Sequence, residues 1–275
     1  MEYNFYKIFK KKKVIIGAIH FPPLLGYPEF PGFKVALKNA LKDLAAFEKG
    51  GTDGIIIENN YDIPHKIEVE PHTAASMTFL GERIKEKTKF PLGVSVLWND
   101  FKAALSIAKI IGAKFIRIPV FVDDVETNYD KIFSNPKKVL HYQKNIKAEN
   151  IALFTDIHVK HAKILSKKSI EKSALEAIKF GSDALIITGK WTGNAPDIRE
   201  LKKVRKIAPN FPILIGSGAD KDNIKELLKY ADGAIISTSL KKGGIKSKEV
   251  NVKTWKQRID VKKVQELVKI VNLSS

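Results

Sequence analysis

The 275-residue sequence contains no cysteine, which excludes disulfide bonds, thiol catalysis and cysteine-ligated metal sites. The absence agrees with a cytoplasmic location, which we expect for this chain. Long apolar runs are also missing, because no stretch approaches the roughly 18 apolar residues of a membrane span. Four lysines at 10–13 precede the apolar run Val14–Ile19, but this run is too short for a signal peptide and ends at His20.

Arginine is scarce although the formal net charge is +18, since only five of the 48 basic residues are arginine. Arginine is the usual residue for bidentate contacts with bases and phosphates, so the composition gives no support for nucleic-acid binding. We interpret the lysine excess as a solvated surface, such as a hot habitat favours. Binding to RNA or peripheral association with an anionic membrane is the alternative, and no RNA-binding signature supports the former.

Short β-branched runs alternate with amphipathic stretches along the whole chain, which predicts βαβ units and a parallel sheet. The expected strands are Val14–Ile19, Gly54–Ile57, Leu92–Leu97, Phe115–Val120, Ile151–Ile157, Ala184–Thr188, Ile213–Ile215 and Ala234–Ile236. The expected helices are Val35–Glu48, Thr73–Lys87, Phe101–Ile111, Ile170–Phe180, Ile198–Ile207, Asn223–Lys229 and one near Val261–Val271. Glycines at several helix-to-strand joints suit the left-handed conformation that often ends a helix.

Eight strands close a barrel, so we predict a single-domain (β/α)8 TIM barrel. A doubly wound open sheet is the alternative, but the loop after the first strand has no GxGxxG pattern. Residues 1–12 are read as a basic N-terminal extension, and residues 243–260 as an insertion before the last helix.

Ionisable residues follow the expected strands, at the end where barrel enzymes hold their active sites. In the fifth run, Asp156, His158 and Lys160 alternate with apolar residues and so are expected on one face. The catalytic candidates are Glu58, Asp100, Arg117, Asp156, His158 and Lys160, and the ligand-binding candidates are His20, Asn59, Asn99 and His161.

Each of these residues also has a structural interpretation. An Arg117–Asp156 salt bridge would serve only to satisfy buried charges, and Asp100 is placed to cap a helix. Glu58 is a candidate general base or a loop cap, and Lys160 can form a Schiff base if desolvated. We expect His65, His72 and His141 on the surface. A divalent metal on His20, Glu58, Asp156 and His158 is conceivable, but no ligand spacing supports it, and no cofactor is indicated.

Two short segments of small residues follow the seventh and eighth expected strands, where TIM barrels often bind phosphate. They are Gly216-Ser217-Gly218 and Ser237-Thr238-Ser239. The loop Thr188–Gly193 adds Gly189 and Gly193 beside them, with Trp191 placed to stack on a ring or to cover the mouth. These loops predict a phosphate-binding site.

Several motifs in order resemble the BtpA/SgcQ family over about residues 14–260. They are Val14–Pro23, Gly51–Asn60, Pro91–Asp100, Phe115–Arg117, Asp156–His161, Thr188–Gly193, Gly216–Gly218 and Ala231–Lys241. The resemblance implies a TIM barrel of the phosphate-binding type, and the family's namesake is linked to photosystem I biogenesis at the membrane periphery. Matching positions are Glu58, Asn59, Asn99, Asp100, Arg117, Asp156, Lys160, His161, Gly189, Gly193, Gly216, Ser217, Gly218, Thr238 and Ser239. Members commonly carry asparagine where Ser95 and Pro119 stand, and glycine where Ser237 stands.

Two functional hypotheses follow. The first is an enzyme acting on a small phosphorylated sugar or nucleotide-like ligand, with isomerase, lyase and glycosidic-bond chemistry all open. Asp156, His158 and Glu58 would share the acid–base work, and Arg117 would stabilise negative charge. The second is a non-catalytic biogenesis or stability factor that docks to a membrane complex through its basic surface. We also expect a homo-oligomer.

Overall fold

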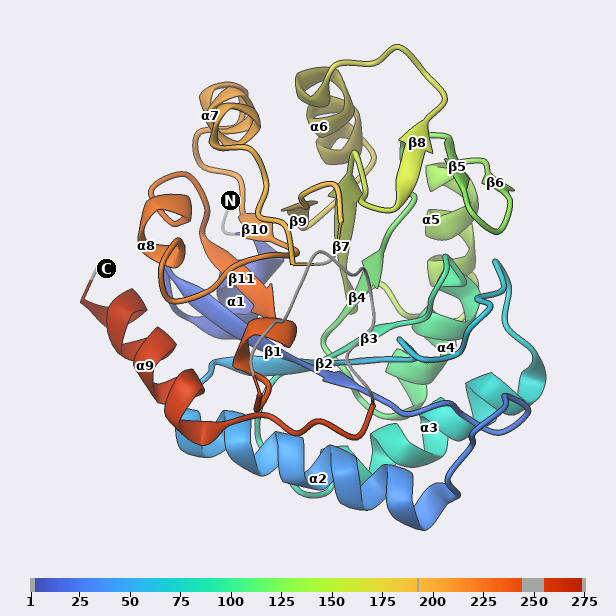
Figure 1. Cartoon of the computed structure of the whole chain (residues 1–275). Coiled ribbons are helices and arrows are strands. Elements are labelled where there is room, and N and C mark those ends of the chain that lie inside the picture. The colour runs from blue at the N-terminus through green and yellow to red at the C-terminus, as the bar shows by residue number, and fades with distance from the viewer. Residues whose placement is uncertain (1–2, 192, 244–254, 274–275) are drawn as a thin grey trace.

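Eight parallel strands pair edge to edge into a closed barrel in the computed structural model, which describes residues 3–191, 193–243 and 255–273 (Figure 1). The predicted (β/α)8 TIM barrel is thus confirmed. The barrel strands are β1 (Val14–His20), β2 (Gly54–Glu58), β3 (Leu92–Ser95), β4 (Phe115–Ile118), β7 (Ala152–Ile157), β9 (Ala184–Ile187), β10 (Ile213–Ile215) and β11 (Gly233–Ile236). The third and fourth strands end two residues earlier than expected, because the chain there turns into loops that cross the barrel mouth.

Helices surround the barrel, and those on its outside are α2 (Phe33–Gly50), α3 (Pro71–Lys85), α4 (Phe101–Ile110), α5 (Pro136–Asn145), α6 (Ile170–Lys179), α7 (Ile198–Ile207), α8 (Ile224–Leu227) and α9 (Val261–Asn272). Side chains that accept a first-turn N–H begin five of them: Asp100, Asn135, Ser169, Asp197 and Asp260. The predicted left-handed glycines are confirmed at Gly51, Gly112 and Gly181. No described helix is long and apolar enough to cross a bilayer.

Helix α5 was not predicted from the sequence. It buries only Val139 and Gln143, so it lacks the apolar stripe by which a helix is recognised. Its start is nonetheless marked locally, because Asn135 accepts the Lys138 N–H and Pro136 occupies the first turn.

Alternation along each strand separates two apolar clusters. In β2, Ile55 and Ile57 pack outward against the helices, whereas Ile56 points into the lumen. The lumen is filled by stacked rings of Phe115 and Phe154, whose centroids are 4.4 Å apart. A Cβ at Gly93 would lie 2.1 Å from the Phe115 ring, so glycine makes room there.

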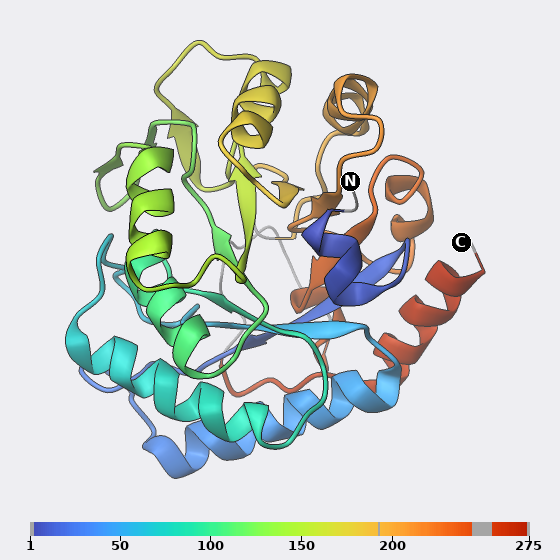
Figure 2. The ribbon, with the colours of Figure 1, turned by 180° about the vertical axis from the view of Figure 1, so that it is seen from behind.

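Helix α1 (Asn4–Phe9) closes the amino-terminal end of the barrel, so the basic segment 1–12 is not simply an extension (Figure 2). Phe5 is fully buried among lumen residues, with its ring centroid 5.8 Å from that of Phe154. The rings of Phe5 and Phe9, which pack against lumen residues, hold this segment at the barrel end, and the lysines do not determine its position.

A small antiparallel sheet is built from the connections that follow β4 and β7. It comprises β5 (Val125–Thr127), β6 (Lys131–Ile132) and β8 (Ala162–Ile164). With Trp98, Val120 and Val159 it forms a third apolar cluster. Strands of two or three residues carry too little periodicity to be predicted from sequence.

The expected insertion at 243–260 lies largely outside the described residues. Its described end returns to the body of the protein, where Ile259 pairs with Lys241 and Arg258 binds Asp43 of α2 at 2.6 Å. This part of the connection is therefore anchored to the barrel.

Truncating the buried ring in α1 should show that this helix belongs to the core. We expect Phe5→Ala to lower the free energy of unfolding by about 3–5 kcal/mol, because it leaves a cavity in the lumen. Chemical denaturation would measure the loss. As a matched control, Phe133→Ala should change stability by less than about 0.5 kcal/mol, since Phe133 is 70% exposed. Equal effects of the two substitutions would contradict a packing role for α1.

Candidate functional site

A layer of mainly polar residues ends the apolar lumen at the carboxyl end of the barrel. On each strand it lies two residues beyond an inward-facing position, as Glu58 follows Ile56 and Arg117 follows Phe115. The layer consists of His20, Glu58, Ser95, Arg117, Asp156, Thr188, Gly216 and Ser237. The alternation along the strands therefore brings together three of the six catalytic candidates, Glu58, Arg117 and Asp156.

A buried ion network runs through this layer. The Arg117 guanidinium donates to both oxygens of Asp156, from Nε at 2.9 Å and from Nη2 at 2.8 Å. Its Nη1 reaches Glu58 at 3.4 Å, and the other Glu58 oxygen lies 3.5 Å from His20 Nε2. Burial disfavours the guanidinium charge, but Asp156 and Glu58 outweigh it and raise the pKa of Arg117. The alternative interpretation, an Arg117–Asp156 salt bridge, thus describes a real contact.

His20 is neutral at pH 7 in this environment. Burial lowers its pKa well below the ordinary value, and the cations of Lys241 and Lys160 add to the shift. The contact with Glu58 therefore joins a carboxylate to a neutral imidazole, which can donate a hydrogen bond without carrying charge.

Two lysines extend the site beyond the network. Burial and the neighbouring Arg117 lower the pKa of Lys160 to about 8, against the opposing effect of Glu58 and Asp156. Burial also lowers the pKa of Lys241 to about 8. Neither ammonium has a carboxylate in ion-pair contact among the described residues. Glu58 and Asp156, which lie near Lys160, pair with Arg117, and Asp43, which lies near Lys241, pairs with Arg258. The site thus has unneutralised positive charge.

Lys241 and its partner Tyr61 were not among the sequence candidates. Lys241 is 4% exposed, and its Nζ lies 3.1 Å from the Tyr61 hydroxyl and 5.3 Å from the centre of that ring. The available signal was its place at the end of the motif Ala231–Lys241. The short helix η1 (Thr238–Leu240) intervenes, so strand alternation could not show that the side chain turns inward.

The loops after β9 and β10 are held together by Ser217. Its hydroxyl accepts the Gly189 N–H and donates to the Asn194 carbonyl, both at 2.9 Å. A Cβ at Gly189 or Gly218 would fall within 2.3 Å of Asn194 backbone atoms. These two glycines are thus required by loop packing, and the Ser217 side chain is engaged within the protein.

Backbone N–H groups remain available in the predicted phosphate loops. Those of Ser217, Gly218, Thr238 and Ser239 have no acceptor among the described residues. The Ser239 hydroxyl donates to Ala219 at 2.8 Å and thereby ties the loop after β11 to the loop after β10. Gly193, with φ at +86°, stands in open space on the neighbouring loop.

Two hydroxyls of the polar layer are buried without a partner among the described residues. They belong to Ser95, which is fully buried, and to Ser237. Ser95 pairs in register with Glu58 on one side and Arg117 on the other, so it lies inside the ion network. Buried polar atoms normally have a partner, so both positions indicate where a bound molecule would contact the protein.

Three candidates instead shape the loops of the mouth. Asp100 caps α4 by accepting the Ala103 N–H, as its structural interpretation predicted, and its other oxygen accepts the Val69 N–H. Asn59 binds the Leu97 backbone, and Asn99 binds both backbone groups of Val120. These side chains hold the loops in place. Their hydrogen bonds go to loop residues and to the first turn of α4, and not to the ion network.

The expectation that Asp156, His158 and Lys160 share one strand face is wrong. Strand β7 ends at Ile157, and His158 has a positive φ of +50°, which breaks the alternation. The His158 backbone N–H donates to Asp123 at 3.3 Å, and the Ser173 hydroxyl of α6 donates to the other Asp123 oxygen at 2.6 Å. The backbone at His158 is therefore linked through Asp123 to α6.

The remaining histidines differ from expectation in part. His65 is buried, and burial lowers its pKa to about 4, so its predicted surface position is wrong. His161 lies beside Trp191, with ring centroids 5.4 Å apart, and burial followed by Lys160 lowers its pKa to about 4. His161 follows Lys160 in the chain, and Trp191 is 47% exposed.

No three histidine or acidic residues among the described ones are grouped so that they could hold a metal ion. The acidic members of the polar layer already pair with Arg117, which leaves them poor ligands for a second cation.

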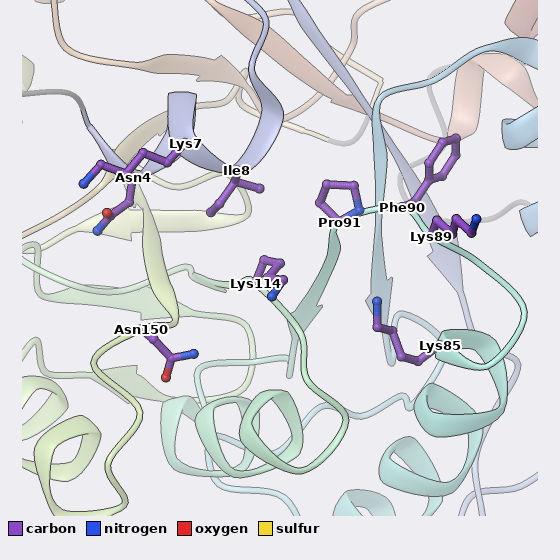
Figure 3. A pocket seen from close by; sticks show the side chains of 9 residues that line it. All are labelled: Asn4, Lys7, Ile8, Lys85, Lys89, Phe90, Pro91, Lys114 and Asn150. Carbon is purple, nitrogen blue, oxygen red and sulfur yellow. The ribbon is translucent and has the colours of Figure 1, made fainter.

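A separate lysine-lined hollow of about 320 Å³ lies at the opposite, amino-terminal end of the barrel (Figure 3). Its lining contains no acidic residue and comprises Asn4, Lys7, Ile8, Lys85, Lys89, Phe90, Pro91, Lys114 and Asn150. The hollow lies where α1 meets the segments leading into β3, β4 and β7.

Comparison with known proteins matches the BtpA family over residues 11–272. The photosystem I biogenesis protein BtpA of Synechocystis is 34% identical over 244 residues, which cover 88% of this chain and 85% of that protein. An uncharacterized protein of Archaeoglobus fulgidus is 36% identical over 234 residues, or 85% of this chain and 94% of that protein.

Solved structures share the fold at low identity. (S)-3-O-geranylgeranylglyceryl phosphate synthase of Thermoplasma acidophilum, in complex with sn-glycerol-1-phosphate, has a TM-score of 0.59 at 16% identity, covering 98% of this chain and 99% of that chain. N-(5'-phosphoribosyl)anthranilate isomerase of Pyrococcus furiosus has a TM-score of 0.56 at 15% identity, covering 95% and 99%.

Removing the central guanidinium should destabilise the fold. We expect Arg117→Met to lower the free energy of unfolding by about 3–5 kcal/mol at pH 7, because Glu58 and Asp156 are left as uncompensated buried charges. Chemical denaturation would measure the loss. Arg199→Met, which removes an exposed ion pair with Asp197, should cost less than about 0.5 kcal/mol. Equal losses in the two variants would argue against the network.

Proposed function

The chain belongs to the BtpA family, and we propose that it is an enzyme that binds a small phosphorylated sugar or nucleotide-like ligand at the carboxyl end of its barrel. The observation that carries this proposal is a pair of ammonium groups, half-buried Lys160 and buried Lys241, that have no carboxylate partner among the described residues. Burying an unpaired charge is costly, so the site is suited to an anion.

The phosphate of such a ligand would lie over the loops after β10 and β11. The donors there are the backbone N–H groups of Ser217, Gly218, Thr238 and Ser239, which have no acceptor among the described residues. TIM barrels often place phosphate at this position, and the synthase with the same fold holds a glycerol phosphate. The Ser217 hydroxyl, which clamps two loops, would support the site without touching the ligand.

The body of the ligand would extend over the polar layer. The unpartnered hydroxyls of Ser95 and Ser237 offer hydrogen bonds to the hydroxyl groups of a sugar. In neutral His20 the nitrogen beside Glu58 is the donor, and the other ring nitrogen can accept a hydrogen bond from the ligand. Because Asp156 is bound through both oxygens, its role would be to hold Arg117, and proton exchange near neutral pH would pass to Lys160.

A panel of phosphorylated pentoses and hexoses should raise the melting temperature of the protein, and calorimetry should give a Kd for the best member. We expect Lys241→Met to weaken that affinity at least tenfold, because it removes one of the two unneutralised cations. Affinity should also fall above about pH 8, where Lys160 and Lys241 lose their protons.

Lys144→Met is the matched control, because Lys144 is an exposed lysine at the end of α5. It should bind the ligand as the parent protein does. The proposed site is wrong if no phosphorylated ligand shifts the melting temperature. It is also wrong if Lys241→Met binds the ligand as well as Lys144→Met does.

A second function is favoured by the lysine-lined hollow at the other end of the barrel. We propose that this face docks on an anionic membrane surface; the Synechocystis relative is named a photosystem I biogenesis protein. Four lysines without an acidic neighbour in the lining would attract lipid phosphates, and salt would screen this attraction.

Sedimentation with vesicles of phosphatidylglycerol and phosphatidylcholine would test this second function. Binding is expected in low salt and should be lost at high salt. The double variant Lys89→Ala/Lys114→Ala should bind several-fold more weakly, whereas Lys241→Met, at the far end of the barrel, should bind normally. Vesicle binding that does not depend on the four lysines would refute a role for the hollow.

A further inference from the structure

Lys160, which is half-buried, differs from Arg117 and Lys241 in having no side-chain partner among the described residues. Arg117 is bound by two carboxylates, and Lys241 lies against the Tyr61 hydroxyl. The Lys160 side chain lies near Arg117, Glu58 and Asp156, yet forms no ion pair or hydrogen bond with any described residue. Its amine is therefore available to a ligand.

The surroundings of this amine favour its neutral form. Desolvation and an adjacent cation are the two means by which proteins make a lysine nucleophilic, and Lys160 has both. The nearby carboxylates cannot reverse this effect, because Arg117 already engages them. A neutral amine retains the lone pair that attacks a carbonyl carbon.

The backbone of Lys160 is tied to the loops proposed to bind phosphate. Its N–H donates to the Thr188 hydroxyl at 2.9 Å, and the next residue, Gly189, donates to Ser217 at 2.9 Å. These two hydrogen bonds fix the start of the lysine side chain relative to the loop after β10. A ligand held there by its phosphate would extend towards the amine.

We propose that Lys160 captures the carbonyl group of an open-chain phosphorylated aldehyde or ketone as an imine. This inference rests on the proposed function and specifies its substrate class. The Nζ lone pair forms a bond to the carbonyl carbon, and the C=O π electrons pass to oxygen. One proton moves from nitrogen to that oxygen to give a carbinolamine. The hydroxyl group then leaves with a second proton as water, and the C=N bond forms without any oxidant or reductant.

The ring pair of His161 and Trp191 supports such a step. His161 follows Lys160 in the chain and its ring packs beside that of Trp191, so the pair would limit access of water to the imine from that side. The His161 N–H donates to the Lys190 carbonyl at 3.1 Å, so the lysine segment and the covering loop are joined.

Borohydride reduction of the full-length protein with glyceraldehyde 3-phosphate or ribose 5-phosphate tests the proposal. Intact mass should rise by one ligand minus one oxygen atom, as expected for loss of water and gain of two hydrogens. Peptide mapping should place this adduct on Lys160. In Lys160→Arg, which keeps the positive charge but lacks the nucleophile, the adduct should fall at least tenfold. Lys144→Arg is the control and should retain it.

Glycerol 1-phosphate, which has no carbonyl group, separates the two proposals. If it binds but the sugar phosphates leave no adduct on Lys160, the imine is refuted and the phosphate site stands. If no phosphorylated compound binds at all, the proposed function fails first. An adduct spread evenly over surface lysines, and unchanged in Lys160→Arg, would be non-specific glycation and would also overturn the imine.

Discussion

A guanidinium buried inside a barrel must be neutralised by carboxylates, and this requirement determines the arrangement of charged residues at the carboxyl end of the barrel. Arg117 on β4 is neutralised by Asp156 from β7 and Glu58 from β2, so residues far apart in the chain converge in one network. The network is complete only when β2, β3, β4 and β7 lie side by side. Because it occupies both carboxylates, Lys160 has no carboxylate partner among the described residues, and this is a property on which anion binding would depend.

The alternation of each strand divides the molecule into regions with different tasks. Outward positions hold the helices, inward positions fill the lumen with apolar side chains, and the last inward position of most strands is polar. Phe5 of α1 completes the apolar lumen from below. The polar layer thus lies on a rigid apolar floor, which is the arrangement that keeps charged groups in fixed positions for a ligand.

The loops above this floor combine packing with binding. Gly189 and Gly218 allow the loops after β9 and β10 to approach one another, and Ser217 links these two loops by hydrogen bonds. The Ser217 side chain is therefore engaged within the protein. The groups left to bind a ligand are backbone N–H donors, other hydroxyls and lysines. This division of roles explains why small residues dominate these segments: a larger side chain would separate the loops before it could contact anything bound.

The sequence by itself determined the eight strands, most of the helices, the barrel, and the convergence of His20, Glu58, Arg117 and Asp156, because local periodicity sets both element type and facing direction. It did not reveal α5, which buries too few apolar residues, or the closing role of α1. Only the tertiary structure decided that β7 ends before His158, that Asp100 and Asn99 hold the loops in place, and that Lys241 belongs to the site. These outcomes depend on a positive φ, on capping partners and on barrel closure, and such contacts between distant segments leave no periodic trace in the chain.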